Sequence, residues 1–163
     1  MTDRKPNIVF ILIDDMGWRD ISCYGSTFYE TPNIDRLVAQ GLTFTDAQSG
    51  SAVCSPTRYG VLTGRYSWRT RMKRGIVGQW QPQLIADERL TIAELVRDKG
   101  YATACIGKWH LGTADRYHPT QFGFHVFRGF RGGGTKVKDP PLEIDGQIRE
   151  HEGFTTDILT DYA

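Results

Sequence analysis

Cysteine is scarce in this sequence, and its count excludes one class of small folds. The 163 residues include three cysteines, Cys23, Cys54 and Cys105. An odd and sparse set does not supply the paired framework of a disulfide-rich domain. We therefore expect Cys23 and Cys105 to be packed thiols in a fold that a hydrophobic core stabilises.

A large excess of one charge and a long apolar run are also missing. The formal net charge is +1, whereas nucleic-acid-binding domains usually carry a strong basic excess. The apolar run over 7–13 is too short to cross a bilayer, and acids follow it instead of a small-residue cleavage site. We therefore expect no nucleic-acid partner and no membrane partner. If Met1 is the true start, the expected location is cytoplasmic.

One basic stretch departs from this balance. It contains five cations and two aromatic side chains, namely Arg65, Tyr66, Trp68, Arg69, Arg71, Lys73 and Arg74. Such a stretch can attract an anionic substrate or form a solvated face, and we favour the solvated face.

The most informative pattern begins at Cys54 and reads Cys-Ser-Pro-Thr-Arg. Pro56 suits the first turn of a helix, where its fixed φ fits and its missing N–H costs no hydrogen bond. Cys54 would then lie at the helix N-terminus, where backbone N–H groups and the helix dipole favour an anion. Arg58 follows one turn later on the same face, so its guanidinium can reach the group that Cys54 carries. The pattern predicts a site for a reactive side chain and an anion.

A second pattern lies over 100–112. Residues 101–106 predict a short buried strand with a glycine on either side. Lys108 and His110 follow its carboxyl end, where open α/β sheets have their sites. In an extended chain, their i, i+2 spacing directs both side chains the same way. Considered alone, Lys108 is a solvated lysine and His110 a structural histidine.

A third pattern is the apolar run over 7–13, which ends in Asp14 and Asp15. The run predicts a central parallel strand. Two carboxylates at a strand end can bind a hard cation such as Ca²⁺ or Mg²⁺. Because side chains alternate along a strand, both can bind one ion only if the chain stops or bends at Asp14. Considered alone, an acidic pair after a strand is more often a turn.

The rest of the chain predicts a βα alternation. Thr31 and Thr91 suit the N-caps of two helices that end at Gly41 and Gly100. Their apolar sides are Ile34, Leu37 and Val38 in the first and Ile92, Leu95 and Val96 in the second. We further predict a short strand over 42–45 and a helix that starts at 155 and is uncapped at the last residue. Three histidines without ligand spacing are expected to be surface or packing residues: His118, His125 and His151.

These patterns carry a family resemblance. The run over 52–64 resembles the modification signature of type I sulfatases, in which the cysteine of Cys-x-Pro-x-Arg is oxidised to Cα-formylglycine. The block over 100–112, with Gly-Lys-Trp-His, resembles the second sulfatase signature. Asp14 and Asp15, in Asp-Asp-Met-Gly-Trp, match the acids that bind the divalent metal in this family. The resemblance covers nearly the whole chain but only the N-terminal portion of a sulfatase.

The resemblance implies a fold, a domain assignment and a cofactor. The fold would be the alkaline-phosphatase-like α/β sandwich, with a mostly parallel central sheet flanked by helices. Residues 1–163 would form the N-terminal part of a sulfatase catalytic domain, truncated within a helix. The implied metal is Ca²⁺, with Mg²⁺ as the alternative, and its ligands here are Asp14, Asp15 and Cys54 as formylglycine. The family's remaining metal ligands and sulfate-binding residues come from later sequence.

The resemblance also implies the chemistry of sulfate ester hydrolysis. One hydroxyl of hydrated formylglycine at position 54 attacks sulfur, and the other then expels sulfate. Arg58 would hold the modified side chain, Lys108 would bridge it to the sulfate, and His110 would orient or deprotonate a hydroxyl. The implied partners are a sulfate ester substrate and a formylglycine-generating or anaerobic sulfatase-maturing enzyme.

Two alternatives stay open at the level of sequence. A formylglycine-dependent phosphonate or phosphate ester hydrolase can share Cys-x-Pro-x-Arg and the metal acids, although residues 107–110 favour sulfate. The chain as it stands can also be an inactive fragment that binds a metal or an anion, because the family's other ligands lie in later sequence.

Overall fold

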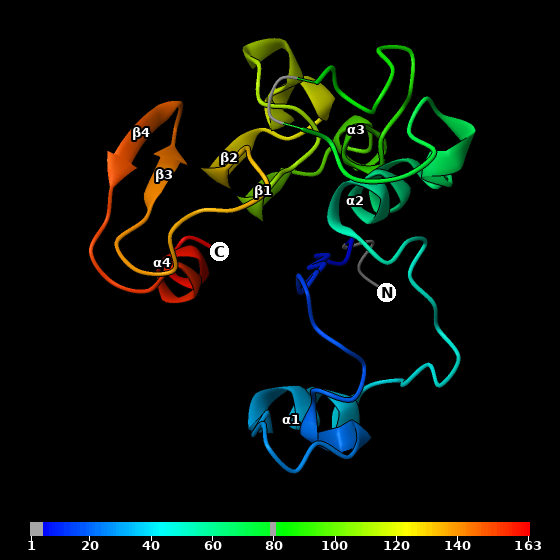
Figure 1. Cartoon of the computed structure of the whole chain (residues 1–163), viewed down its shortest axis with the longest axis vertical. Helices are drawn as coiled ribbons and strands as arrows, with labels where there is room; N and C mark the ends of the chain where they lie inside the picture. The colour runs from blue at the N-terminus through cyan, green and yellow to red at the C-terminus, as the bar shows by residue number, and fades with distance from the viewer. Residues whose placement is uncertain (1–4, 79–80) are drawn as a thin grey trace. The chain divides into compact units, whose positions relative to one another are not determined.

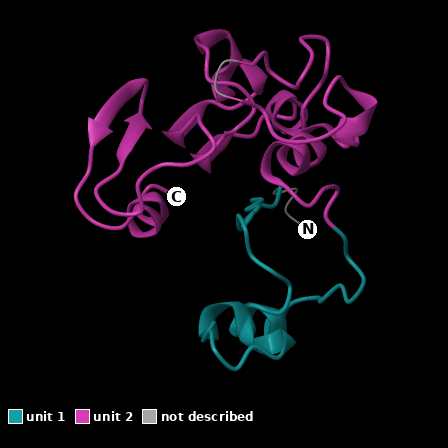
Figure 2. Ribbon diagram, viewed as in Figure 1, with its two compact units in different colours: residues 1–48 teal, residues 49–163 magenta. Residues whose placement is uncertain are grey.

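The computed structural model describes residues 5–78 and 81–163. The chain divides into two compact units, residues 1–48 and residues 49–163 (Figure 2). Within the described residues, the first unit is helical and irregular, and the second contains all the strands. No helix in these two described stretches has the length and apolarity that a membrane span requires.

The first unit is organised around α1 (Pro32–Gln40) and a short 3₁₀ helix, η1 (Ser22–Tyr24). Helix α1 begins directly after Thr31, as predicted. The Thr31 hydroxyl accepts a hydrogen bond from the backbone N–H of Ser22 at 2.9 Å and donates to the Asp35 carboxylate at 3.2 Å. Thr31 therefore connects the two helices of this unit.

Two predicted strands of the first unit are absent from its described residues. Residues 7–13 are irregular, and Val9 and Ile11 expose 83% and 72% of their surface. A central strand needs hydrogen-bonded neighbours and cover on both faces, and the described residues of this unit contain no strand that could provide them. Residues 42–45 are likewise irregular. The prediction that Cys23 is a packed thiol was also wrong, since Cys23 is exposed.

The second unit combines helices with a mixed four-stranded sheet (Figure 1). Its α-helices are α2 (Cys54–Thr63), α3 (Ile92–Asp98) and α4 (Thr155–Asp161). Its 3₁₀ helices are η2 (Ser67–Arg69), η3 (Asp115–Tyr117) and η4 (Pro119–Phe122). Its strands, in spatial order, are β1 (Ala104–Lys108), β2 (Val126–Phe130), β3 (Pro141–Ile144) and β4 (Gln147–Glu150). Strands β1 and β2 are parallel, and the two later pairs are antiparallel.

Strand β1 is displaced from the predicted range of 101–106, so Lys108 is its last residue instead of following it. The strand pairs closely with β2, where Gly107 lies opposite Gly129. A Cβ atom added to Gly129 would lie 2.0 Å from the Gly107 carbonyl oxygen, so only glycine fits this position. The parallel pairing continues beyond β1, because the Trp109 N–H donates to the Phe130 carbonyl at 3.0 Å.

Helix α3 starts as predicted but buries a different face. Thr91 and Glu94 form a capping box, in which the Glu94 carboxylate accepts from the Thr91 N–H at 2.8 Å. The predicted inward residues Ile92 and Leu95 expose 52% and 48% of their surface, whereas Ala93 is buried. The small Ala93 side chain therefore marks the face on which the helix packs.

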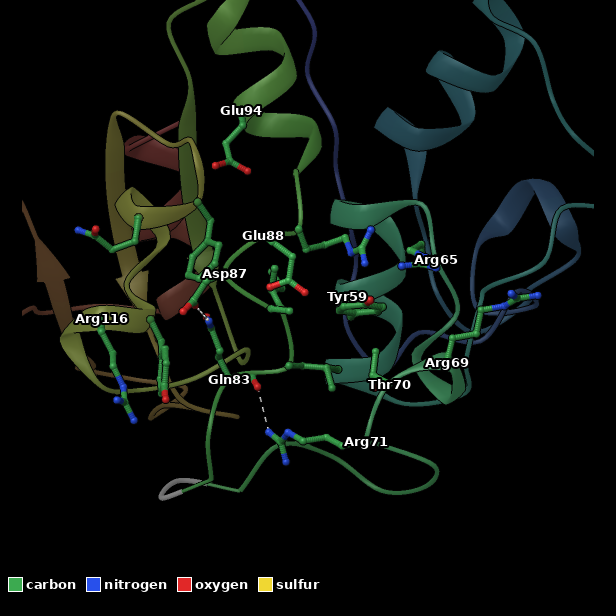
Figure 3. Close-up of a pocket in the computed structure, with 17 residues that line it drawn as sticks. Tyr59, Arg65, Arg69, Thr70, Arg71, Gln83, Asp87, Glu88, Glu94 and Arg116 are labelled. Carbon is green, nitrogen blue, oxygen red and sulfur yellow. Dashed lines mark hydrogen bonds between the residues drawn. The ribbon is translucent and has the colours of Figure 1, made fainter.

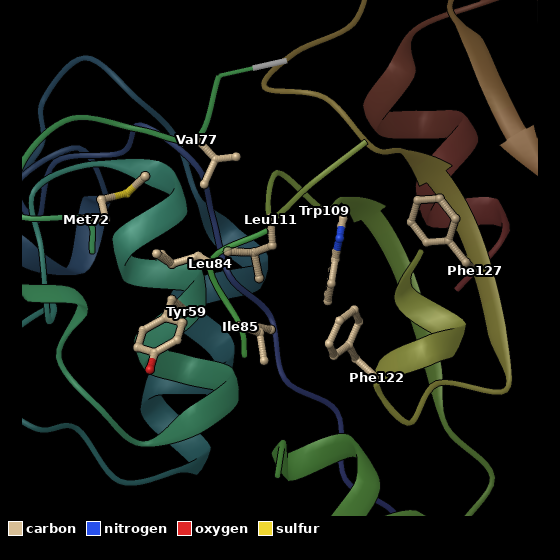
Figure 4. Packing of buried hydrophobic residues seen from close by; sticks show 9 residues of the cluster. All are labelled: Tyr59, Met72, Val77, Leu84, Ile85, Trp109, Leu111, Phe122 and Phe127. Atoms are coloured by element: carbon tan, nitrogen blue, oxygen red, sulfur yellow. The ribbon is translucent and has the colours of Figure 1, made fainter. Parts of the chain in front are cut away.

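The core of the second unit surrounds the segment that follows β1 (Figure 4). Its buried members are Tyr59, Met72, Val77, Leu84, Ile85, Trp109, Leu111, Phe122 and Phe127. Trp109 is 2% exposed, its ring centroid lies 5.9 Å from that of Phe122, and its indole N–H donates to the Tyr117 carbonyl at 2.9 Å. Packing of Trp109 and Leu111 thus fixes the backbone on both sides of His110.

A network of charged side chains connects strand β3 of the sheet to the chain that follows His110. The guanidinium of Arg131 donates to both oxygens of the buried Glu143 carboxylate, at 2.6 and 2.8 Å. Arg131 also donates to Asp115 at 2.7 Å and to the Thr113 carbonyl at 3.1 Å. The His118 ring lies 3.1 Å from Glu143. The network joins β3 to the chain that follows His110.

We expect this network to make the protein less stable in acid. Its hydrogen bonds to Arg131 lower the pKa of Glu143 below 4.5, and burial lowers the pKa of His118 below 6.5. In both cases the unfolded chain binds more protons than the folded one, so the free energy of unfolding falls as the pH drops below about 6.5 and again below about 4.5. Urea unfolding at about pH 7.5, 5.5 and 4 measures this loss.

The variant Glu143→Gln distinguishes the pH dependence of stability that this network causes from that of other titrating groups. The amide does not titrate, so the variant should lose stability at neutral pH and show a flatter dependence below about pH 4.5. Asp145→Asn is the matched control, because Asp145 lies in the same hairpin and its side chain is 60% exposed. An unchanged acid dependence in Glu143→Gln would contradict the assignment.

Candidate active site

The first part of the site is the start of α2. Cys54 is the first residue of the helix and is half-buried, and Pro56 lies in the first turn, as predicted. Ser55 is fully buried, and its hydroxyl accepts a hydrogen bond from the Val77 N–H at 3.1 Å. Gly64 ends the helix in the left-handed region at φ 66°. The sequence pattern therefore located the helix N-terminus and the cysteine correctly.

Arg58 connects α2 to the end of β1. Its Nη1 donates to the Lys108 carbonyl oxygen at 2.6 Å, across 50 residues of sequence. Its charge also acts on Cys105 in β1, where burial raises the pKa of the thiol to about 12 and Arg58 opposes the rise. Cys105 is partly buried against the hydrophobic core, in agreement with its predicted packing role, and burial favours its protonated form.

Lys108 and His110 lie where β1 ends, but His110 itself does not have an extended backbone. Gly107 has φ 103° and His110 has φ 58°, both in the left-handed region. The argument from i, i+2 spacing in an extended chain was therefore wrong. His110 is instead placed by tertiary contacts: its N–H donates to the Arg131 carbonyl at 3.0 Å, and its Nε2 lies 3.1 Å from the Val77 carbonyl oxygen.

In the first unit, Asp14 and Asp15 form a turn after the apolar run. Asp15 has φ 53°, which provides the bend that a shared ion requires. One carboxylate oxygen of each residue lies within 4.8 Å of the other, and both residues are exposed. Two hard oxygen donors at this spacing fit Ca²⁺ or Mg²⁺.

Comparison with known protein families identifies the family of this chain. The family model described as Sulfatase matches residues 6–163. The chain belongs to the sulfatase family. The matched range includes Cys54, Arg58, Lys108 and His110 in the second unit and Asp14 and Asp15 in the first.

Curated sulfatases are similar over most of this chain. An N-acetylgalactosamine-6-O-sulfatase of Bacteroides thetaiotaomicron is 44% identical over 123 residues, covering 76% of this chain and 24% of its own. Human arylsulfatase A is 41% identical over 128 residues, covering 77% and 25%. The chain spans about a quarter of the length of these relatives.

Solved structures confirm the α/β fold. The crystal structure of Ps i-CgsB matches 98% of this chain and 40% of its own, with a TM-score of 0.91 and 29% identity. A structure in complex with its substrate D-glucosamine-2-N,6-O-disulfate matches 98% of this chain and 30% of its own, with a TM-score of 0.79 and 30% identity. The sulfatase chain therefore has the alkaline-phosphatase-like fold that its signatures imply.

The basic stretch of this sulfatase borders an open groove of about 890 Å³ (Figure 3). Arg65, Arg69 and Arg71 line it, and Arg71 donates to the Pro82 and Gln83 carbonyls. The lining also includes three acids, Asp87, Glu88 and Glu94. Because both signs of charge line the groove, it does not form a purely basic surface.

Sequence reasoning missed Val77 and Gly133, which contact His110, and Ser55, which contacts Val77. Ser55 lies at a position of Cys-x-Pro-x-Arg that the motif leaves unspecified. Its hydroxyl group was therefore the one feature of the sequence that could have indicated a role. Val77 contributes its backbone, and Gly133 contributes the absence of a side chain, since a Cβ there would lie 2.8 Å from His110 Nε2. A backbone carbonyl has no residue-type signature, and a glycine within the run 132–134 does not reveal which side chain packs against it.

Proposed function

We propose that these residues are the N-terminal portion of a sulfatase catalytic domain that hydrolyses sulfate esters. The observation that carries the proposal is the hydrogen bond from Arg58 to the Lys108 carbonyl. It joins the helix that begins with Cys54 to the strand end that carries Lys108 and His110. Two signatures that are far apart in sequence thereby contribute to one region of the second unit.

Each side chain of this region has a proposed task. Cys54, after oxidation to formylglycine by a maturation enzyme, provides the nucleophile. Arg58 holds that side chain, and Lys108 binds a sulfate oxygen and offsets its negative charge. His110 moves a proton at the nucleophilic hydroxyl. The half-buried position of Cys54 supports its access to a substrate.

We further propose a divalent cation, Ca²⁺ or Mg²⁺, as the cofactor, with Asp14, Asp15 and the modified residue 54 among its ligands. When bound, the ion supplies Lewis-acid stabilisation of the negative charge that develops at the nucleophile. The oxygen donors and the turn at Asp15 support this assignment in the first unit. The family membership of the chain supports the participation of residue 54.

The substrate class is tested with paired esters. The full-length protein should hydrolyse an aryl sulfate and a sulfated amino sugar, such as the disulfated glucosamine bound by one structural relative, faster than the matching aryl phosphonate. The reason is the membership of the chain in the sulfatase family, whose curated relatives are named as sulfatases. Dominant phosphonate hydrolysis would instead establish the phosphonate or phosphate ester hydrolase.

The 163-residue chain alone provides a second test. We expect it to bind Ca²⁺ weakly and to turn over no sulfate ester, because two carboxylates leave most of the coordination shell of the ion to water. Calcium titration calorimetry and an aryl sulfate assay measure both properties. Robust turnover by this chain would show that it needs no residues beyond those present.

A further inference from the structure

Ser55 is a buried hydroxyl beside the proposed nucleophile. It follows Cys54 in α2, is 0% exposed, and accepts a hydrogen bond from the Val77 N–H at 3.1 Å. Burial of a hydroxyl group costs free energy unless the group forms such a hydrogen bond. The bond holds the backbone of Val77 against the first turn of α2.

The carbonyl group of the same residue, which lies in the next peptide unit, contacts His110. The Val77 carbonyl oxygen lies 3.1 Å from His110 Nε2. A carbonyl oxygen can only accept, so Nε2 must carry the hydrogen in this contact. In the neutral ring, Nδ1 then holds the lone pair and is the atom that can accept a proton. The Val77 carbonyl thus selects one tautomer of His110.

The surroundings leave the His110 ring little freedom. His110 is 6% exposed, and its backbone N–H is held by the Arg131 carbonyl at 3.0 Å. A Cβ atom added to Gly133 would lie 2.8 Å from Nε2, so the ring packs directly against the glycine backbone. The Val77 carbonyl is therefore a close hydrogen-bond acceptor for a ring that has little room to turn.

We propose that Ser55 is a positioning residue for His110, which it holds in the Nε2–H tautomer through the backbone of Val77. The catalytic meaning of this tautomer rests on the proposed function, in which Nδ1 of His110 takes the proton of the nucleophilic hydroxyl. The tautomer is assigned from contacts within the second unit.

The test compares Ser55→Ala with the natural sequence in the full-length protein. Nitrogen-15 NMR of the histidine ring at neutral pH should show a protonated Nε2 and an unprotonated Nδ1 for His110. In Ser55→Ala, the two resonances should move toward each other as the tautomers mix. We also expect kcat for an aryl sulfate to fall by about tenfold with little change in KM, as for other residues that orient a functional histidine.

Two further variants sharpen the result. Ser55→Thr keeps the hydroxyl and should restore the ring resonances toward those of the natural sequence. Thr57→Ala removes a hydroxyl from the same helix that donates to the Ser51 carbonyl at 2.9 Å, so it should leave His110 unchanged. The formylglycine content of every sample is measured by mass spectrometry, which separates altered maturation from altered catalysis.

The outcomes are distinct. Unchanged His110 resonances in Ser55→Ala, or equal mixing in Thr57→Ala, would overturn the positioning role. Mixed tautomers in Ser55→Ala alone, in a protein that hydrolyses no sulfate ester even in its natural sequence, would support the positioning role and refute the proposed function.

Discussion

Replacing Cys54 by alanine in the full-length protein is expected to lower kcat for sulfate ester hydrolysis by at least about a thousandfold. The methyl group cannot be oxidised to an aldehyde and offers no atom that attacks sulfur. The position at the start of α2 remains compatible with alanine, so the fold should persist. Steady-state rates with an aryl sulfate, together with circular dichroism of the folded protein, measure the effect.

The matched control is Cys23→Ala, which removes an exposed thiol from the first unit. It should retain the activity of the natural sequence. If Cys54→Ala kept more than about a tenth of that activity, residue 54 would not be the nucleophile, because loss of a covalent nucleophile costs far more.

The second large effect is expected at the acidic turn. Asp14→Asn and Asp15→Asn each remove one negative charge from the proposed calcium ligands. We expect weaker Ca²⁺ binding and a fall in kcat/KM on the order of a hundredfold in each variant, because the metal supplies several kcal/mol of charge stabilisation. Calorimetric titration with Ca²⁺ and rates over a range of Ca²⁺ concentrations measure the two effects separately.

Asp46→Asn is the control for this pair, since Asp46 is an exposed acid of the same unit outside the turn. It should bind Ca²⁺ as the natural sequence does. If Asp14→Asn and Asp15→Asn both bound Ca²⁺ with unaltered affinity, these two residues would not be ligands of the metal. Restored rates at high Ca²⁺ would instead show that the loss arises from binding.

Local signals predicted the helices well, because capping and turn chemistry act within a few residues. Pro56 located the first turn of α2, and Thr91 with Glu94 formed the expected capping box. The buried face of α3 was not predictable in the same way. Ala93 is buried and Ile92 is exposed because the neighbouring elements, which the helix sequence does not specify, determine the packing.

The strands were harder to predict, since they depend on partners elsewhere in the chain. The apolar run over 7–13 indicates a segment suited to burial, but the described residues of the first unit provide no strand to pair with it. The β3–β4 hairpin was missed although Asp145 and Gly146 carry a turn signal. Both have positive φ, at 51° and 80°, as a two-residue type I′ turn requires.

The candidate site shows the same division. Cys54, Arg58, Lys108 and His110 could be selected from their motifs, and the structure brings Arg58 to the end of β1. The contacts that fix His110 could not be selected, because Val77 acts through its carbonyl group. A backbone group has no residue-type signature, so only the three-dimensional structure identifies it.

The central claim is that residue 54 acts as formylglycine, and a mass spectrum tests it most directly. The full-length protein is taken from its native source, shown to hydrolyse an aryl sulfate, and digested to release the peptide that contains residues 54–58. We predict an aldehyde at position 54 in the active protein. An unmodified thiol at position 54 in a fully active preparation would contradict the account.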